Sequence, residues 1–118
     1  MQGSKVAMEF AQEEAGDILI VRLAGRLDSS TSPQAEENLT RALASGKPHL
    51  ATDLSQLEYI SSAGLRVLLV VAKKLQQVQG KVVLFGLGAN VREVFAISGF
   101  DRIFAIEPDE AAALAALR

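Results

Sequence analysis

The sequence of 118 residues contains no cysteine and no tryptophan, and it has a single histidine. Without cysteine, disulfides, thiolate nucleophiles and thiolate metal sites are all excluded. The absence also fits a reducing compartment. We therefore expect a cytoplasmic location.

The sequence also lacks a long hydrophobic run, although 49% of its residues are hydrophobic. No apolar stretch approaches the roughly 18 residues that a membrane span needs, and none of signal-peptide length follows Met1. The formal net charge of −2 argues against a nucleic-acid surface, which usually shows a clustered excess of lysine and arginine. We therefore expect a soluble protein that neither inserts into membranes nor binds nucleic acid.

The length predicts one domain that covers residues 1–118. A chain of this size buries about two-thirds of its unfolded surface, which provides one core and leaves no room for a second. Periodicity predicts strands and helices in the order β-β-α-β-α-β-α-β-α. The expected strands cover residues 6–12, 17–23, 49–54, 81–85 and 103–106. The expected helices cover residues 32–45, 62–79, 91–98 and 110–117.

Strands that alternate with helices imply an α/β fold with a small, mostly parallel sheet and right-handed crossovers. The first two strands are separated only by a turn at 13–16, so they form an N-terminal hairpin at the sheet edge. About four helices cover the sheet. We expect a hydroxyl of Thr31-Ser32 to cap the first helix, with Pro33 at its first helical position. We expect Asn90 to cap the third helix in a capping box with Glu93, and Asp109 to cap the last.

Two carboxylates follow or end predicted strands. Asp28 and Asp53 both stand at such ends, so we expect them at one edge of the sheet. Carboxylates there can hold a metal or help to position a phosphoryl donor. More often they cap a following turn.

The most unusual segment joins a strand to a helix and reads Tyr-Ile-Ser-Ser-Ala-Gly-Leu over residues 59–65. Ser61 or Ser62 can cap the orphan backbone N–H groups of the helix. Ala63 and Gly64 add almost no side chain, so we expect the helix start to be open to approach from outside. Glycine in a first helical turn costs roughly 1 kcal/mol relative to alanine, which indicates a reason other than helix propensity.

One side of this helix combines a hydroxyl with a basic and apolar stripe. At about 100° per residue, five residues fall on neighbouring positions of that side: Ser62, Arg66, Leu69, Val70 and Lys73. The opposite side is broad and apolar, and we expect it to face the core: Leu68, Val71, Ala72, Leu75 and Val78. A purely solvated face would not need Leu69 or Val70, so we expect the stripe to contact a partner.

A hydroxyl at a helix N-terminus suits a phosphate group, because the terminus carries partial positive charge and free N–H groups. Arg66 lies four residues after Ser62 and could reach the same group. A phosphate of about −1.5 to −2 charge inside a protein contact would disrupt that contact through desolvation and repulsion. The alternative is a serine that acts only as a helix cap, which is its commoner role at this position.

With other short matches, the segment resembles the signature of the STAS domain family, and more closely that of bacterial anti-sigma factor antagonists. Asp-Leu-Ser at 53–55 precedes it. Gly-Arg-Leu-Asp at 25–28 resembles the Gly-x-Leu-Asp that follows the family's second strand. The C-terminal pattern is also similar: Val91, Phe95, Ser98-Gly99-Phe100 and Phe104. The resemblance covers nearly all of the chain.

The resemblance implies partner switching in bacterial transcription regulation. In that family the unphosphorylated antagonist binds an anti-sigma factor, which is also a serine kinase with an ATP-binding domain, and the sigma factor is freed. Phosphorylation of one residue at the helix start breaks the complex, and a PP2C-type phosphatase restores it. The family's acceptor stands two residues before the glycine, which makes Ser62 the expected phosphorylation site.

The resemblance also implies which neighbours of the acceptor contribute. The position before the acceptor is often aspartate in the antagonists, and Ser61 here is an alternative acceptor. Ala63 stands where serine or threonine is common, so it cannot replace Ser62. The expected partner contact combines the resemblance with the helix stripe: Asp28, Ser61, Ala63, Gly64, Arg66, Leu69, Val70 and Lys73.

Two other classes of function remain open. STAS-like domains also occur as unphosphorylated regulatory subunits of transporters or larger signalling assemblies, and Ser62 would then be a plain cap. An enzyme would need a second catalytic group near Ser62, but His49 starts a strand and no nucleophile-elbow pattern surrounds the serine. Gly86-Leu87-Gly88 lacks the third glycine of a dinucleotide fingerprint. We expect no catalytic residue, metal site or cofactor.

Overall fold

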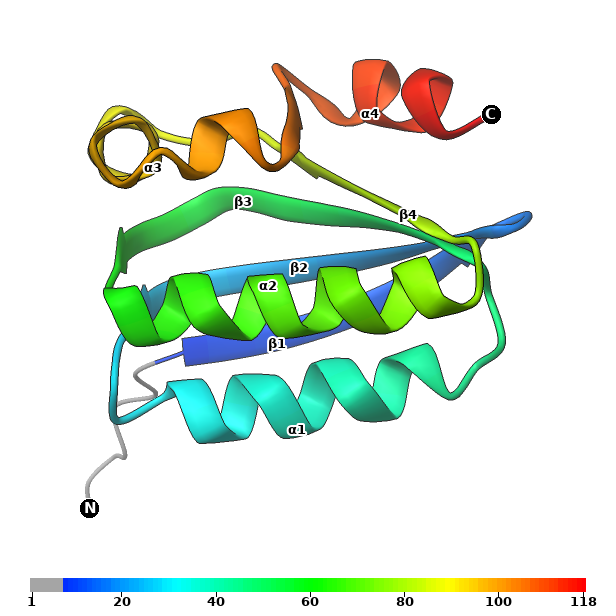
Figure 1. Cartoon of the computed structure of the whole chain (residues 1–118), viewed down its shortest axis with the longest axis horizontal. Coiled ribbons are helices and arrows are strands. Elements are labelled where there is room, and N and C mark those ends of the chain that lie inside the picture. Colours follow the sequence, from blue (N-terminus) through cyan, green and yellow to red (C-terminus); the bar gives the residue numbers. More distant parts are fainter. Residues whose placement is uncertain (1–7) are drawn as a thin grey trace.

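The computed structural model describes residues 8–118, which build a five-stranded sheet with helices on both faces (Figure 1). The strands are β1 (Met8–Ala15), β2 (Ile18–Leu27), β3 (His49–Ile60), β4 (Lys81–Phe85) and β5 (Ala105–Glu107). They stand in the sheet in chain order, with β1 antiparallel to β2 and each later pair parallel. The predicted α/β fold with an N-terminal edge hairpin is confirmed.

A helix connects each parallel strand to the next. These helices are α1 (Ser32–Leu43), α2 (Ser62–Gln77) and α3 (Ala89–Ser98); a short 3-10 helix (Phe100–Arg102) precedes β5, and α4 (Glu110–Leu117) follows it. The predicted order of strands and helices is confirmed, with the 3-10 helix added. No helix among residues 8–118 is long and apolar enough to cross a bilayer.

Alternation along β2 sends apolar side chains to both faces of the sheet. Leu19, Val21 and Leu23 join the larger core, to which α1, α2 and α3 contribute. Ile18 and Ile20 join a smaller core with side chains of α4. Figure 1 shows α1 and α2 running alongside each other across one face, with α4 beyond the strands. The sheet thus places the starts of α1 and α2 at the same edge, where β2 and β3 end.

The hairpin turn is shorter than predicted. β1 pairs with β2 without a break as far as Ala15 opposite Ile18, so the expected turn at 13–16 is wrong. Only Gly16 and Asp17 reverse the chain. Gly16 has φ +62°, a conformation that suits a two-residue hairpin. Residues 6 and 7 of the first expected strand lie outside the described residues.

β2 and β3 are longer than predicted. They pair as far as Leu27 opposite Ile60, whereas the expected ends were residues 23 and 54. Their pairing shifts register twice, once after Arg22 and once after Gly25. Such irregularities break the alternation of apolar and polar side chains on which the prediction relied.

The predicted capping residues fare differently in α3 and α4. α3 begins at Ala89 behind Gly88, with no side-chain cap, so the capping box at Asn90 is wrong. Asp109 caps α4 as predicted, because its carboxylate accepts a hydrogen bond from the backbone N–H of Ala112 at 2.9 Å.

Two apolar residues near element ends are more exposed than predicted. Val78 was expected in the core but is 65% exposed, since α2 ends at Gln77. Ile103 was expected in the last strand but is 58% exposed, since it ends the 3-10 helix and β5 begins at Ala105.

Candidate functional site

The start of α2 is fixed by the ends of β2 and β3. Leu27 and Ile60 are the last paired residues of these strands. The backbone N–H of Ser61 donates to the carbonyl oxygen of Leu27 at 2.9 Å, which carries the contact between the strands one residue further. α2 therefore begins directly at the carboxyl edge of the parallel sheet, where ligands of α/β proteins commonly bind.

The two serines of this segment have different roles. Ser61 is the N-cap of α2, and its hydroxyl accepts a hydrogen bond from the backbone N–H of Gly64 at 3.4 Å. Ser62 is the first helical residue and is exposed, and its hydroxyl makes no hydrogen bond with any other described residue. The reading of Ser62 as a plain cap is therefore wrong, because its neighbour already supplies the cap.

Gly64 faces inward. It is buried, and a Cβ atom at this position would lie 2.8 Å from Cγ1 of Ile60 and 2.8 Å from Cγ of Leu27. The expectation that Gly64 opens the helix start to approach from outside is wrong. The glycine instead lets the first turn of α2 pack directly on the ends of β2 and β3. Ala63 is half-buried at the same turn.

Asp28 organises the loop between β2 and α1. Its Oδ1 accepts hydrogen bonds from the hydroxyl of Ser30 at 2.7 Å, the N–H of Ser30 at 2.9 Å and the N–H of Thr31 at 3.2 Å. The Ser30 hydroxyl and then these backbone groups lower the pKa of the carboxyl, so it stays ionised. Asp28 thus caps the following turn, as the sequence suggested, next to the start of α2.

Thr31 supports the same loop and does not cap α1. Its hydroxyl donates to the carbonyl oxygen of Arg26 at 2.9 Å and accepts from the N–H of Asp28 at 2.9 Å. The hydroxyl of Ser32 donates to the carbonyl oxygen of Asp28 at 2.6 Å and does not cap α1 either. The predicted hydroxyl cap is therefore wrong, and α1 starts with Pro33 in its first turn. Proline lacks the N–H that a cap would otherwise satisfy.

A stacked cation lies beside Asp28. The guanidinium carbon of Arg26 stands 4.4 Å from the ring centroid of Tyr59, and Nε of Arg26 is 3.8 Å from Oδ2 of Asp28. Tyr59 is 39% exposed. In the sequence Arg26 and Tyr59 belong to two separate matched segments, and only the register that pairs them brings them together.

The outer face of α2 matches its prediction. Ser62, Arg66 and Lys73 are exposed, whereas Leu69 and Val70 are half-buried. Within residues 8–118 neither Arg66 nor Lys73 forms an ion pair. In the part of the chain that the structure describes, the helix therefore presents an unbonded hydroxyl at its tip, followed by two unpaired cations with apolar side chains between them.

Asp53 is not at this edge. Because β3 continues to Ile60, Asp53 lies in mid-strand opposite Arg22, and its Oδ2 accepts from Nη1 of Arg22 at 2.8 Å. Arg22 also binds Glu110 of α4 at 2.8 Å, and Glu13. The expected grouping of Asp53 with Asp28 is therefore wrong. Asp53 belongs to an ion network that connects α4 to the sheet.

His49 is far from Ser62. His49 is the first residue of β3, and Ser62 follows just after its last residue. At about 3.3 Å per residue a strand of this length spans roughly 35 Å, so the two side chains cannot form a catalytic pair. Within residues 8–118 no group of three or more potential ligand side chains could hold a metal ion.

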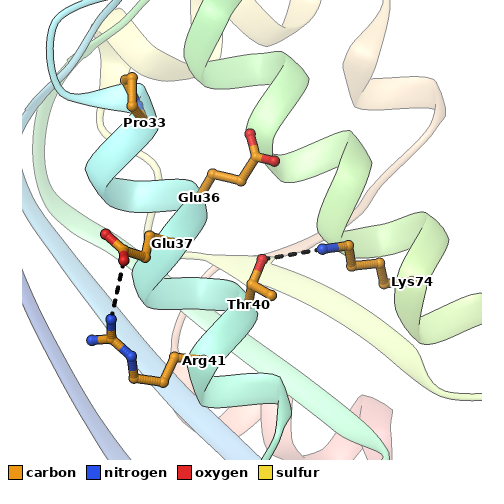
Figure 2. A pocket seen from close by; sticks show the side chains of 6 residues that line it. All are labelled: Pro33, Glu36, Glu37, Thr40, Arg41 and Lys74. Carbon is orange, nitrogen blue, oxygen red and sulfur yellow. Dashed lines mark hydrogen bonds and ion pairs between the residues drawn. The ribbon is translucent and has the colours of Figure 1, made fainter.

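A hollow of about 670 Å³ lies between α1 and α2 (Figure 2). The cations that line it are already bonded. Nη2 of Arg41 is 3.3 Å from Oε2 of Glu37, and Nζ of Lys74 donates to Oγ1 of Thr40 at 3.2 Å. The hollow therefore offers no free cation among its lining residues.

The STAS domain family matches residues 9–113, which hold nearly all of the sheet, the serine-containing segment 59–65 and the first half of α4. This chain belongs to the STAS domain family. The resemblance drawn from the signature segment is thereby confirmed.

The relatives of this STAS domain are regulatory proteins by name. BtrV of Bordetella bronchiseptica, named as a candidate anti-sigma factor antagonist, is 44% identical over 111 residues, which cover 94% of this chain and 96% of BtrV. An anti-sigma-B factor antagonist of Listeria monocytogenes is 32% identical over 102 residues, which cover 86% of this chain and 89% of that protein. The crystal structure of an anti-sigma factor antagonist from Mycobacterium paratuberculosis superposes with a TM-score of 0.86 at 28% identity, over 94% of each chain.

Proposed function

We propose that this STAS domain is an anti-sigma factor antagonist switched by phosphorylation of Ser62. In its unphosphorylated form it binds an anti-sigma factor that is also a serine kinase with an ATP-binding domain, and the sigma factor is freed. Phosphorylation breaks this complex, and a PP2C-type phosphatase restores it. The protein itself catalyses no reaction, and it works with its partners in the cytoplasm.

The observation that carries the proposal is the free hydroxyl of Ser62. A kinase must reach its acceptor, and Ser62, at the first position of α2, is exposed and its hydroxyl bonds to none of the described residues. Ser61 is half-buried and its hydroxyl is engaged with Gly64. This difference favours Ser62 over Ser61 as the acceptor.

A phosphate on Ser62 would not unfold the helix. It would lie at the positive end of α2, where anions are stabilised. Arg66 follows one turn later, is exposed and is free to bind it. The phosphate adds a charge of about −1.5 to −2 to the surface and binds Arg66, the first cation of the basic stripe on α2. Both changes weaken binding to a partner that recognises the basic stripe, while the fold stays intact.

The partner contact in this proposal covers the sheet edge and the outer face of α2. Seven residues form it: Asp28, Ser61, Ala63, Arg66, Leu69, Val70 and Lys73. Gly64 supports the contact from beneath, because its close packing on Leu27 and Ile60 sets the position of the helix start.

The test compares Ser62→Ala and Ser62→Asp as baits in native lysate, with mass spectrometry of what they retain. We expect the Ala variant to retain an ATP-binding anti-sigma serine kinase and the Asp variant to lose it. With purified kinase and ATP, we expect phosphate to map to Ser62 of the unsubstituted protein, and Ser62→Ala to stay bound.

Ser45→Asp is the matched control. Ser45 is an exposed serine just beyond the C-terminal end of α1, so this substitution adds the same charge away from the start of α2. It should bind like the unsubstituted protein. Retention of the same partner by both Ser62 baits would overturn the switch, and the domain would then be a constitutive subunit of the captured assembly.

A further inference from the structure

A second hollow, smaller than that in Figure 2, lies between α2 and the segment that leads into β5. We call it the Ile103 groove, and its volume is about 300 Å³. Its two main walls come from α2 and from the two residues between the 3-10 helix and β5: Leu69, Ala72, Lys73, Gln76, Ile103 and Phe104.

The wall opposite α2 is firmly packed but has an exposed apolar lip. Phe104 is only 6% exposed and contacts the ring of Phe95 edge-on, at 6.2 Å between centroids, and the ring of Phe100 in a stack, at 6.1 Å. Ile103, the residue before Phe104, is 58% exposed. Ile103 adjoins the apolar lining residues Leu69, Ala72 and Phe104. A contiguous apolar surface of this kind, unlike a lone exposed isoleucine, marks an interaction site.

The groove carries charge of one sign. Lys73 is its only charged lining residue, and it forms no ion pair within residues 8–118. Arg66, two turns earlier on the same face of α2, also has no ion pair among the described residues. The hollow between α1 and α2 differs, because its cations are bonded to Glu37 and Thr40 (Figure 2).

We infer that the Ile103 groove belongs to the surface that binds the anti-sigma factor, and that it receives an apolar side chain from an acidic segment of that partner. The inference rests on the proposed function and extends its contact beyond α2. Leu69 and Lys73 lie both on the outer face of α2 and in the groove, so the two surfaces are continuous. A partner carboxylate completes the contact at Lys73.

The size and lining of the groove fit a side chain better than a small molecule. Its volume stands at the lower end of the roughly 300–1,000 Å³ of small-molecule pockets. Only Lys73 and Gln76 offer side-chain hydrogen bonds at its walls. A phosphate-bearing ligand would need several convergent donors.

The first test measures the affinity of the purified kinase, identified with the Ser62→Ala bait, for Ile103→Ser and Ile97→Ser. Ile97 is 81% exposed on α3 and does not line the groove, so it is the matched control. We expect Ile103→Ser to bind about tenfold more weakly, as for a truncated interface anchor, and Ile97→Ser to bind like the unsubstituted protein. Equal affinity of the two variants would overturn the inference.

The second test reverses one charge on each side of α2. Lys73→Glu should weaken binding about tenfold or more and reduce its salt dependence, because like charges across an interface repel. Lys74→Glu changes the adjacent lysine, which bonds to Thr40 on the α1 side, and should bind like the unsubstituted protein. An equal loss for both variants would contradict a specific contact at the groove.

The third test does not depend on a loss of affinity. Since the sequence has no cysteine, Ile103→Cys and Ile97→Cys each carry a unique thiol. Saturating kinase should slow alkylation of the thiol at 103 and leave that at 97 unchanged. An unchanged rate at 103 in a bound complex rejects the groove while the antagonist function stands. Failure of Ser62→Ala to bind any anti-sigma kinase rejects the function itself.

Discussion

Gly64 lies directly against Leu27, so that a Cβ atom on the glycine would stand 2.8 Å from Cγ and 2.9 Å from the carbonyl oxygen of the leucine. The same oxygen accepts the N–H of Ser61. The helix start that bears Ser62 is thus placed by backbone contact with the end of β2. Its position depends on the packing beneath it more than on its own helix propensity.

Gly64→Ala should therefore destabilise the fold, although alanine is the better helix former. The added methyl group meets two side chains and a backbone oxygen, and overpacking of this kind costs about 1–3 kcal/mol. Urea unfolding measures the loss. Gly88→Ala is the control, since a Cβ there meets nothing within 4 Å and its φ of −71° is ordinary. It should cost less than about 1 kcal/mol. A Gly64→Ala variant as stable as this control contradicts the packing argument.

Ser61→Ala and Ser62→Ala should differ in stability. The first removes the N-cap hydrogen bond, which costs about 0.5–2 kcal/mol, with the low end expected for a bond of 3.4 Å. The second removes an exposed, unbonded hydroxyl and should stay within about 0.5 kcal/mol of the unsubstituted protein. Parallel urea titrations measure the free energy of unfolding of both variants. The cap is wrongly assigned if Ser62→Ala is the less stable variant.

Ser62→Asp should move stability and partner binding in opposite directions. A carboxylate in the first turn of α2 interacts favourably with the helix dipole, by about 0.3–1 kcal/mol. The same charge removes binding to the anti-sigma kinase in the proposed switch. Thermal unfolding and a binding titration on one preparation measure both effects. A variant that loses binding because it unfolds would count against the switch.

Arg22→Met should destabilise the protein by about 1–3 kcal/mol, because it leaves the mostly buried carboxylate of Asp53 without its charged partner. It also removes the contact to Glu110, so hydrogen exchange in α4 should quicken. Arg41→Met is the control, since its pair with Glu37 is exposed and contributes at most about 1 kcal/mol. Equal unfolding free energies for these variants would show that the ion network does not hold α4.

Acid should weaken the same network. Burial acts to raise the pKa of Asp53, but hydrogen bonds from Ser55 and the interaction with Arg22 outweigh burial and hold this pKa below its usual value. The carboxylate thus stabilises the fold fully above the unfolded pKa of about 3.9, and this contribution is lost as pH falls through the folded pKa. Urea unfolding between pH 6 and pH 3 should show a smaller loss for Arg22→Met than for the unsubstituted protein. Parallel losses would refute this assignment.

The sequence by itself determined the order of strands and helices, the exposed stripe of α2 and the pair of serines at its start. These features follow from spacing along one element, because side-chain directions repeat with a fixed period in strands and helices. The sequence also singled out the segment 59–65, because two hydroxyls and two small residues stand together there, where a strand meets a helix.

Only the tertiary structure decided what these residues contact. β2 and β3 continue past their expected ends, with two register shifts along the way. Asp53 therefore lies in mid-strand away from Asp28, and Arg26 lies over Tyr59. The inward position of Gly64 depends on Leu27, which lies beneath it. The Ile103 groove forms because α2 packs beside Ile103 and Phe104, which come much later in the chain. Spacing along one element predicts neither contact. Spacing along the chain fixes which way a side chain points, whereas its partner is fixed by strand register and packing.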